Sequence, residues 1–207
     1  YGLDRFSEDL DFSLLRPAPD FPLQSYLNAM RRELEGFGLL QIGAPEGITR
    51  RVPAGQLLKV KFEVDTDPPP GFDTEIRYIL QPVPFSVRVF TPQDLFAGKM
   101  HALLCRRWGQ RVKGRDWYDM VWFAGRKTPL NLDHLAARMR QTGDLKAEEP
   151  LDKEAWKDRL FHTIEDMDIN AAKQDVLPFL RDTSRLALWS EDFFKAVAEE
   201  IPASSGA

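Results

Sequence analysis

Cysteine and histidine are scarce in this chain of 207 residues, which has one cysteine and three histidines. Cys105 has no partner for a disulfide within the chain, so we expect a protein of the reducing cytoplasm. His101, His134 and His162 are scattered, without the paired Cys or His spacings of known zinc motifs. The sequence therefore disfavours a structural zinc site.

Long apolar runs and several catalytic motifs are also missing. No apolar run approaches the length needed to cross a bilayer, and no basic-then-apolar leader precedes the first predicted strand, so we expect neither membrane insertion nor export. Ser7 lacks the Gly-x-Ser-x-Gly context of an esterase nucleophile, and the chain has no Walker-type or kinase-type glycine loop. No Rossmann fingerprint supports hydride transfer either.

The charge balance lacks a basic excess. The chain has 28 Lys and Arg residues against 32 Asp and Glu residues, for a formal net charge of −4. Such a protein does not coat nucleic acid by bulk electrostatics, so any contact with RNA or DNA must be local. A hydrophobic fraction of 43% is enough for the core of one large domain or two small ones.

The most informative feature present is a pair of carboxylates, Asp9 and Asp11, in an otherwise apolar run typical of a strand. Side chains alternate across a strand, so both carboxylates point the same way. Neighbouring carboxylates repel each other unless a cation lies between them, and Mg²⁺ or Mn²⁺ takes oxygen ligands of this kind. The pattern predicts a metal platform for phosphoryl or nucleotidyl transfer, although a solvated strand edge produces the same triplet.

The chain reads as a strand-rich front followed by a helical back, which predicts an α+β fold. Asp20 can cap a helix whose apolar residues recur from Leu23 to Phe37, and the prolines and glycines of residues 43–55 predict a loop. Residues 57–65, 75–80 and 85–90 read as strands. From Thr91 onward the period is helical, so we expect a core domain over residues 1–91 and a helical part over 92–207.

The strand predicted over residues 57–65 has a charged face. Strict alternation places Lys61, Glu63 and Asp65 together, opposite an apolar face. Glu63 and Asp65 are rival candidates for a third metal-binding carboxylate, and Lys61 is a candidate nucleotide contact.

A helix is predicted from Thr91, which takes the N-cap position ahead of Pro92. Lys99 and Arg106 are seven residues apart and so lie on the same helix face. Lys99 lies among apolar residues, where it either binds an anion or covers the core with its stem while its amine reaches water.

The one concentrated basic stretch follows this helix and contains Trp108. Basic side chains interleaved with aromatics suit nucleic-acid contacts, although a solvated basic loop has the same composition. Its candidate contacts are Arg107, Arg111, Lys113 and Arg115. Asp116 and Asp119 come next at helical i, i+3 spacing and share a face, where Asp116 either pairs with Arg115 or orients a catalytic group.

Taken together, these stretches resemble the abortive-infection nucleotidyltransferase toxins of the AbiEii type. The resemblance is carried by residues 5–12, 61–64, 97–106 and 114–119, in that order, and continues more weakly through 173–179 and 189–194. It implies a nucleotidyltransferase-like mixed sheet with flanking helices, followed by a helical C-terminal half. It also implies transfer of a nucleoside monophosphate from an NTP to an acceptor such as the tRNA 3′ end, and a cognate antitoxin as partner.

The resemblance also assigns roles to residues. Asp9 and Asp11 match the metal-binding pair, Ser7 a donor-contacting hydroxyl, Lys99 the phosphate-binding lysine and Asp116 a later essential aspartate. Arg106 would support Lys99 at the phosphates, and a divalent metal ion is implied as cofactor. The glycine turn that holds the triphosphate in this family would precede residue 1, and it is not in the given sequence.

Two other functions remain open on the sequence. One is a non-catalytic module on the same fold that binds protein or RNA through the basic stretch. The other is metal-dependent phosphodiester hydrolysis, which uses similar carboxylates but has less need of a lysine for a triphosphate.

Overall fold

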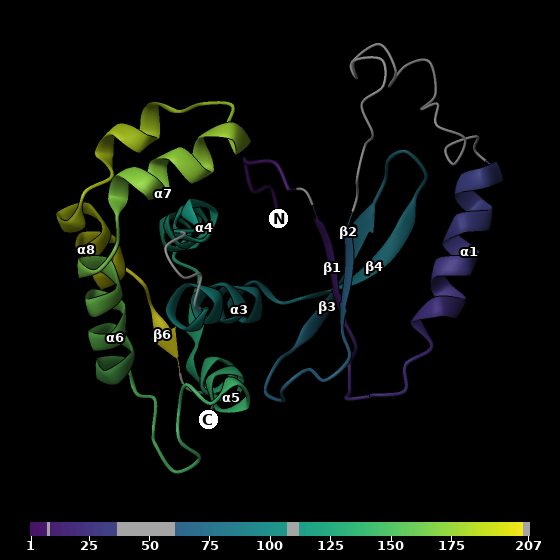
Figure 1. The fold of residues 1–207 in the computed structure, drawn as a ribbon, viewed down its shortest axis with the longest axis horizontal. Coiled ribbons are helices and arrows are strands. Elements are labelled where there is room, and N and C mark those ends of the chain that lie inside the picture. The colour runs from purple at the N-terminus through teal and green to yellow at the C-terminus, as the bar shows by residue number, and fades with distance from the viewer. Residues whose placement is uncertain (8, 37–60, 107–111, 205–207) are drawn as a thin grey trace. The chain divides into compact units, whose positions relative to one another are not determined.

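The computed structural model describes residues 1–7, 9–36, 61–106 and 112–204 (Figure 1). The chain packs into two compact units, one of Tyr1–Phe6 with Pro69–Ala207 and one of Ser7–Pro68, and each is described by itself. The α+β class is confirmed, and the described strands form three two-stranded sheets. The division into residues 1–91 and 92–207 stays a prediction.

The unit of Ser7–Pro68 contains a parallel strand pair and one described helix. Strand β1 (Asp9–Ser13) pairs with β2 (Lys61–Asp65), and helix α1 (Leu23–Gly36) lies between them in the chain. The predicted helix and strands are present, while residues 37–60, including the predicted loop and the start of the second strand, lie outside the described residues. Phe12 and Phe62 stack on the apolar face with ring centroids 6.3 Å apart. A slip of one residue between the strands would place the two rings on opposite faces, so their contact favours this register.

The other unit begins its continuous part with a hairpin. Strand β3 (Thr74–Ile79) pairs antiparallel with β4 (Phe85–Phe90), as the alternation of apolar residues predicted to within one residue. The hairpin leads directly into helix α3 (Pro92–Cys105).

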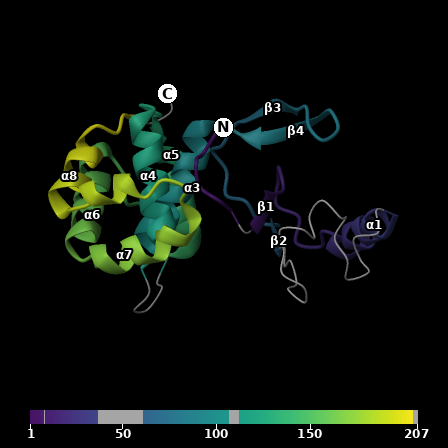
Figure 2. The ribbon, with the colours of Figure 1, turned by 90° about the horizontal axis from the view of Figure 1, so that it is seen from above.

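Helices dominate the rest of this unit, and Figure 2 shows them gathered in one group. They are α4 (Gly114–Gly125), α5 (Leu132–Thr142), α6 (Lys153–Glu165), α7 (Ile169–Val176) and α8 (Glu191–Glu199), with the 3₁₀ turns η1 (Leu177–Phe179) and η2 (Ser184–Leu188). The short strands β5 (Leu130–Asn131) and β6 (Ala203–Ser204) pair in parallel. None of the described helices is long and apolar enough to span a bilayer.

Side-chain caps set the starts of four of these helices. Asn131, Asp152, Asp168 and Ser190 each accept a hydrogen bond from the backbone N–H three residues on, at 2.8–3.1 Å. Such a cap stabilises a helix by about 1 kcal/mol. Thr91 occupies the predicted N-cap position of α3 but does not cap through its side chain. Its hydroxyl instead donates to the buried carboxylate of Asp94, which also accepts from Asp73 N–H and Asn131 Nδ2.

The hydrophobic core lies among these helices. Phe96, Trp156 and Phe194 are fully buried, and Phe96 stacks on Phe123 with ring centroids 4.7 Å apart. Burying a large apolar side chain contributes roughly 1.5–3 kcal/mol. This core holds α3 and α4, the helices that carry most of the predicted site residues of this unit.

Helix α4 begins in direct backbone contact with α7. A Cβ placed on Gly114 would lie 1.9 Å from the Ala172 carbonyl oxygen and 3.1 Å from Val176 N. Glycine is therefore required at the first residue of α4, because any side chain would separate the two helices.

The first residues of the chain are anchored on this helical unit. Phe6 N–H donates to Phe179 O at 2.9 Å, and Arg5 forms an antiparallel bridge with Leu180. Asp4 accepts hydrogen bonds from Tyr118 at 2.8 Å and from Arg185 at 2.9 Å. These contacts bring Arg5 to α4.

Candidate functional site

A charged face on the β1–β2 pair brings the predicted metal-binding carboxylates together. The register places Asp9 opposite Lys61 and Asp11 opposite Glu63, and paired residues in a sheet project from the same face. Asp9, Asp11 and Glu63 therefore share one face; the sequence predicted that Asp9 and Asp11 point the same way, and the register adds Glu63. Asp65 is on this face too but lies opposite Ser13, one step further along the pair. The register thus favours Glu63 over Asp65 as the neighbour of the aspartate pair.

Lys61 is the cation recorded on this face. Its ammonium group forms an ion pair with Glu63. The hydrogen bond to Glu63 raises the pKa of Lys61, and the negative charges of Asp9 and Asp11 add to the rise. The carboxylates of Asp9 and Asp11 have no hydrogen-bond partner among the described residues. Among the described residues of this face negative charge exceeds positive charge, which suits a hard divalent cation.

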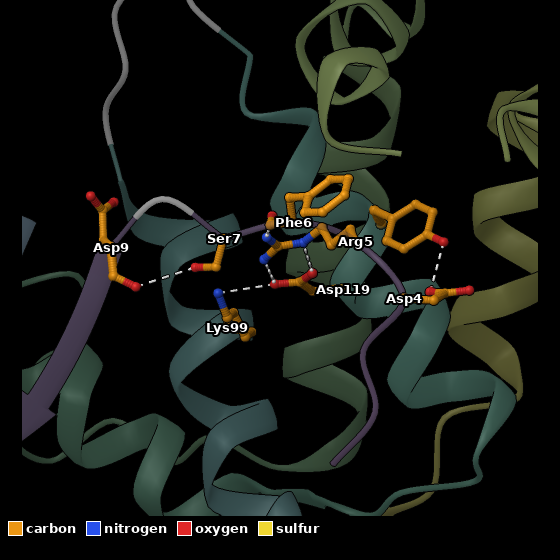
Figure 3. A network of polar contacts seen from close by, with 8 residues as sticks. Asp4, Arg5, Phe6, Ser7, Asp9, Lys99 and Asp119 are labelled. Atoms are coloured by element: carbon orange, nitrogen blue, oxygen red, sulfur yellow. Dashed lines mark hydrogen bonds and ion pairs between the residues drawn. The ribbon is translucent and has the colours of Figure 1, made fainter. Parts of the chain in front are cut away.

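Ser7 lies just ahead of β1. Its hydroxyl donates to the backbone oxygen of Asp9 at 3.3 Å (Figure 3). This bond uses the main chain of Asp9 and leaves its carboxylate available to a ligand.

In the helical unit, a buried aspartate on α4 holds two cations (Figure 3). Arg5 binds both oxygens of Asp119, through Nε to Oδ1 and Nη2 to Oδ2, each at 2.6 Å. Lys99 Nζ lies 2.9 Å from the same Oδ2. The side chains of Asp119 and Arg5 are 0% and 6% exposed, whereas that of Lys99 is 38% exposed.

This cluster of Arg5, Asp119 and Lys99 carries one more positive than negative charge. Burial disfavours the charge on Arg5, but its contacts with Asp119 outweigh that effect and raise the pKa of the guanidinium. An ammonium group has three N–H donors, and that of Lys99 is held by its ion pair with Asp119. Lys99 is therefore held in place at a partly exposed position where it can donate to an anion.

Asp116 lies one turn before Asp119 on the same helix. It is 7% exposed, and its Oδ2 has no hydrogen-bond partner among the described residues. Burial raises the pKa of the Asp116 carboxyl, the charge of Lys99 opposes the rise, and Asp119 adds to it. Leaving a buried carboxylate oxygen without a hydrogen-bond partner is costly.

The remaining predicted contacts lie at the ends of α3 and α4. Arg106 is the exposed C-cap residue of α3, and Lys113 is the N-cap residue of α4. Both cations act electrostatically on Asp116. Arg115 lies over the Phe179 ring, with its guanidinium carbon 4.2 Å from the ring centroid. Arg107 and Arg111 lie outside the described residues.

The comparison with protein families agrees with these features. The family model described as "Nucleotidyl transferase AbiEii toxin, Type IV TA system" matches residues 1–199. The chain belongs to the AbiEii family. No curated protein and no solved structure gives a significant match. Membership in the AbiEii family assigns the chain to nucleotidyl transferases of toxin–antitoxin systems, while the roles of individual residues stay predictions.

Two residues of this AbiEii chain were given no role from the sequence. Asp119 was noted only as sharing a helix face with Asp116, and Arg5 only as part of a motif. Their contact joins residues 114 positions apart, which no local pattern indicates. The available signal was the presence of both residues inside the stretches that carry the family resemblance. The predicted meeting of the carboxylates of β1 and β2 with Lys99 stays a prediction.

Proposed function

We propose that this AbiEii protein is a metal-dependent nucleotidyltransferase that moves a nucleoside monophosphate from an NTP to RNA, with the tRNA 3′ end as acceptor. It would act in the cytoplasm as a toxin restrained by a cognate antitoxin. The observation that carries the proposal is the face on which Asp9, Asp11 and Glu63 come together. Family membership supports the type of reaction.

The donor set of this face fits Mg²⁺ or Mn²⁺, because both ions prefer carboxylate oxygens. Asp9 and Asp11 would hold the ion, and Glu63, or its rival Asp65, would complete its ligands. When bound, the ion would supply positive charge that stabilises the transferring phosphate and the departing pyrophosphate.

Lys99 is the proposed binding residue for the β- and γ-phosphates. The ion pair with Asp119 holds the ammonium group of Lys99 in place. An ammonium group has three N–H donors, so donors remain for an anion. Arg106 would add a second cation, while Lys61 and Ser7 would contact the nucleotide near the carboxylates. Fixed cations that neutralise developing charge are the main protein contribution to this class of reaction.

The reaction needs a proton acceptor. The acceptor hydroxyl attacks the α-phosphorus, a new oxygen–phosphorus bond forms, and the bond to pyrophosphate breaks. A carboxylate takes the hydroxyl proton, and we assign this role to Glu63 or Asp65, with Asp116 positioning Lys99 by its charge. Lys113 and Arg115, with Arg107 and Arg111 in the adjoining stretch, would contact the RNA backbone.

The test is a transfer assay with Mg²⁺, each labelled NTP and total tRNA. We expect label on RNA with the unaltered protein, and a loss of at least about 100-fold in Asp9→Asn without loss of the fold, because a metal-binding oxygen is removed. Asp20→Asn removes a carboxylate of the same unit from outside the β1–β2 face and should retain activity. Activity retained in Asp9→Asn would refute the metal assignment. Shortened RNA would indicate hydrolysis, and RNA binding without either reaction would indicate a binding module.

A further inference from the structure

A group of three side chains of types that can ligate a metal ion lies in the helical unit. One ligand atom each of His101, Cys105 and Asp144 lies within 4.8 Å of the others. His101 and Cys105 are four residues apart on α3 and so are one turn apart on the same face. Asp144 directly follows Gly143, the C-cap residue of α5. The sequence analysis did not pair His101 with Cys105 and disfavoured a structural zinc site, and Asp144 comes from a distant element.

An opening beside this group gives it access to solvent. A cavity of about 330 Å³ is lined by Cys105 and Asp144 together with Asp158, Arg159, His162 and Thr163 of α6. It is large enough for several water molecules. An ion held by three protein ligands would therefore have room for water as a fourth ligand.

We propose that His101, Cys105 and Asp144 form a binding site for a divalent transition-metal ion of the Zn²⁺ class. One nitrogen, one sulfur and one oxygen donor match Zn²⁺ and Co²⁺, whereas Mg²⁺ prefers oxygen donors alone. The site is chemically distinct from the carboxylates of β1 and β2. It does not depend on the proposed nucleotidyl transfer.

The surroundings already orient two of the three ligands. Thr142 Oγ1 donates to Asp144 Oδ2 at 2.6 Å and lies 3.1 Å from His101 Nε2. Binding would exchange the contact between Thr142 and His101 for a nitrogen–metal bond. The Sγ–H proton of Cys105 would pass to solvent as the sulfur–metal bond forms.

Such an ion would join α3 to the connection between α5 and α6. His101 is two residues beyond Lys99 on α3. The ion would therefore fix the helix that carries the proposed phosphate-binding lysine.

Titration with Co²⁺ tests the site directly, because a thiolate bound to Co²⁺ produces a charge-transfer absorption. Cys105 is the single cysteine of the chain, so this band reports one residue. We expect the band to saturate at one Co²⁺ per chain and to disappear on addition of Zn²⁺. Cys105→Ser should abolish the band, and His101→Asn or Asp144→Asn should weaken binding by about tenfold or more.

Asp158→Asn is the matched control, since Asp158 lines the same cavity but is not among the three ligands. It should retain the band and the affinity. The double variant Asp9→Asn, Asp11→Asn should also retain both, which separates this site from the proposed Mg²⁺ site.

Absence of the band in the unaltered protein, or equal Co²⁺ affinity in Asp144→Asn, would overturn the proposal. Circular dichroism of each variant shows whether the fold is kept. If Cys105→Ser fails to fold, the result with Asp144→Asn decides.

Discussion

Replacing Asp119 with asparagine should be among the most destabilising single changes in the helical unit. The substitution keeps the shape of the side chain but removes the negative charge that Arg5 and Lys99 share. Arg5 is 6% exposed, so it would be left as a nearly buried charge without its carboxylate. Removing one partner of a buried ion pair costs about 3–5 kcal/mol.

Arg5 and Lys99 should contribute unequally to the free energy of unfolding. Lys99 is 38% exposed, so water screens its attraction to Asp119. We expect Lys99→Met to cost about 1 kcal/mol or less, in the range of partly exposed pairs. Arg5→Met should cost more than Lys99→Met, because two hydrogen bonds to Asp119 are lost, but less than Asp119→Asn, because Lys99 still compensates the carboxylate.

Urea denaturation followed by tryptophan fluorescence measures these costs. The five tryptophans are Trp108, Trp117, Trp122, Trp156 and Trp189, and all belong to the unit of Tyr1–Phe6 and Pro69–Ala207. Asp158→Asn removes an exposed aspartate from α6 and should change the free energy of unfolding by no more than about 0.5 kcal/mol. A cost below about 1 kcal/mol for Asp119→Asn would contradict this account of the cluster. A larger cost for Lys99→Met than for Asp119→Asn would contradict it too.

Two further substitutions test α4. Asp116→Asn should stabilise the protein at neutral pH by on the order of 1 kcal/mol while abolishing transfer, because burial raises the pKa of Asp116 and penalises its charged form. Because the pKa of Asp116 is higher in the folded protein, its stabilising effect is complete below the ordinary carboxyl pKa and is lost as pH rises through the folded pKa. The stability gained by Asp116→Asn should therefore vanish in acid. A gain that does not depend on pH would show that the buried charge is not its cause. Gly114→Ala should destabilise by at least about 1–3 kcal/mol, because its Cβ would overlap Ala172 O. Gly125→Ala at the other end of α4 meets no atom within 4 Å and should be tolerated, and equal thermal stability of the two variants would refute the close contact.

The local elements were predictable because each has a strong period and clear ends. The alternation of residues 75–80 and 85–90 gave strands β3 and β4, and Pro92 marked the start of α3. The same alternation placed Asp9 and Asp11 on one face. Their position opposite Lys61 and Glu63 depends on strand register, which the pattern of one strand does not contain.

The burial of the aspartates on α4 was not predictable from spacing. Asp116 and Asp119 share a helix face on the sequence, but a helix face with charge is usually solvated. Here the N-terminal segment and Lys99 enclose Asp119, and both contacts join distant parts of the chain. The prediction that the Thr91 side chain caps α3 was wrong for a similar reason. Asp94, to which the Thr91 hydroxyl donates, also accepts hydrogen bonds from Asp73 and Asn131, which belong to other parts of the chain.

The order in which residues leave the ribosome determines when the long-range contacts of the helical unit can form. Arg5 forms a β-bridge with Leu180, and β5 pairs with β6 at Ala203–Ser204, so both pairings need residues that are made later. Because synthesis runs from the N-terminus, Arg5 emerges before both of its contacts in the helical unit, Asp119 and Leu180. A nascent chain that stalls before residue 180 would therefore lack the bridge that holds Arg5 beside Asp119, and an unfinished toxin would remain unassembled.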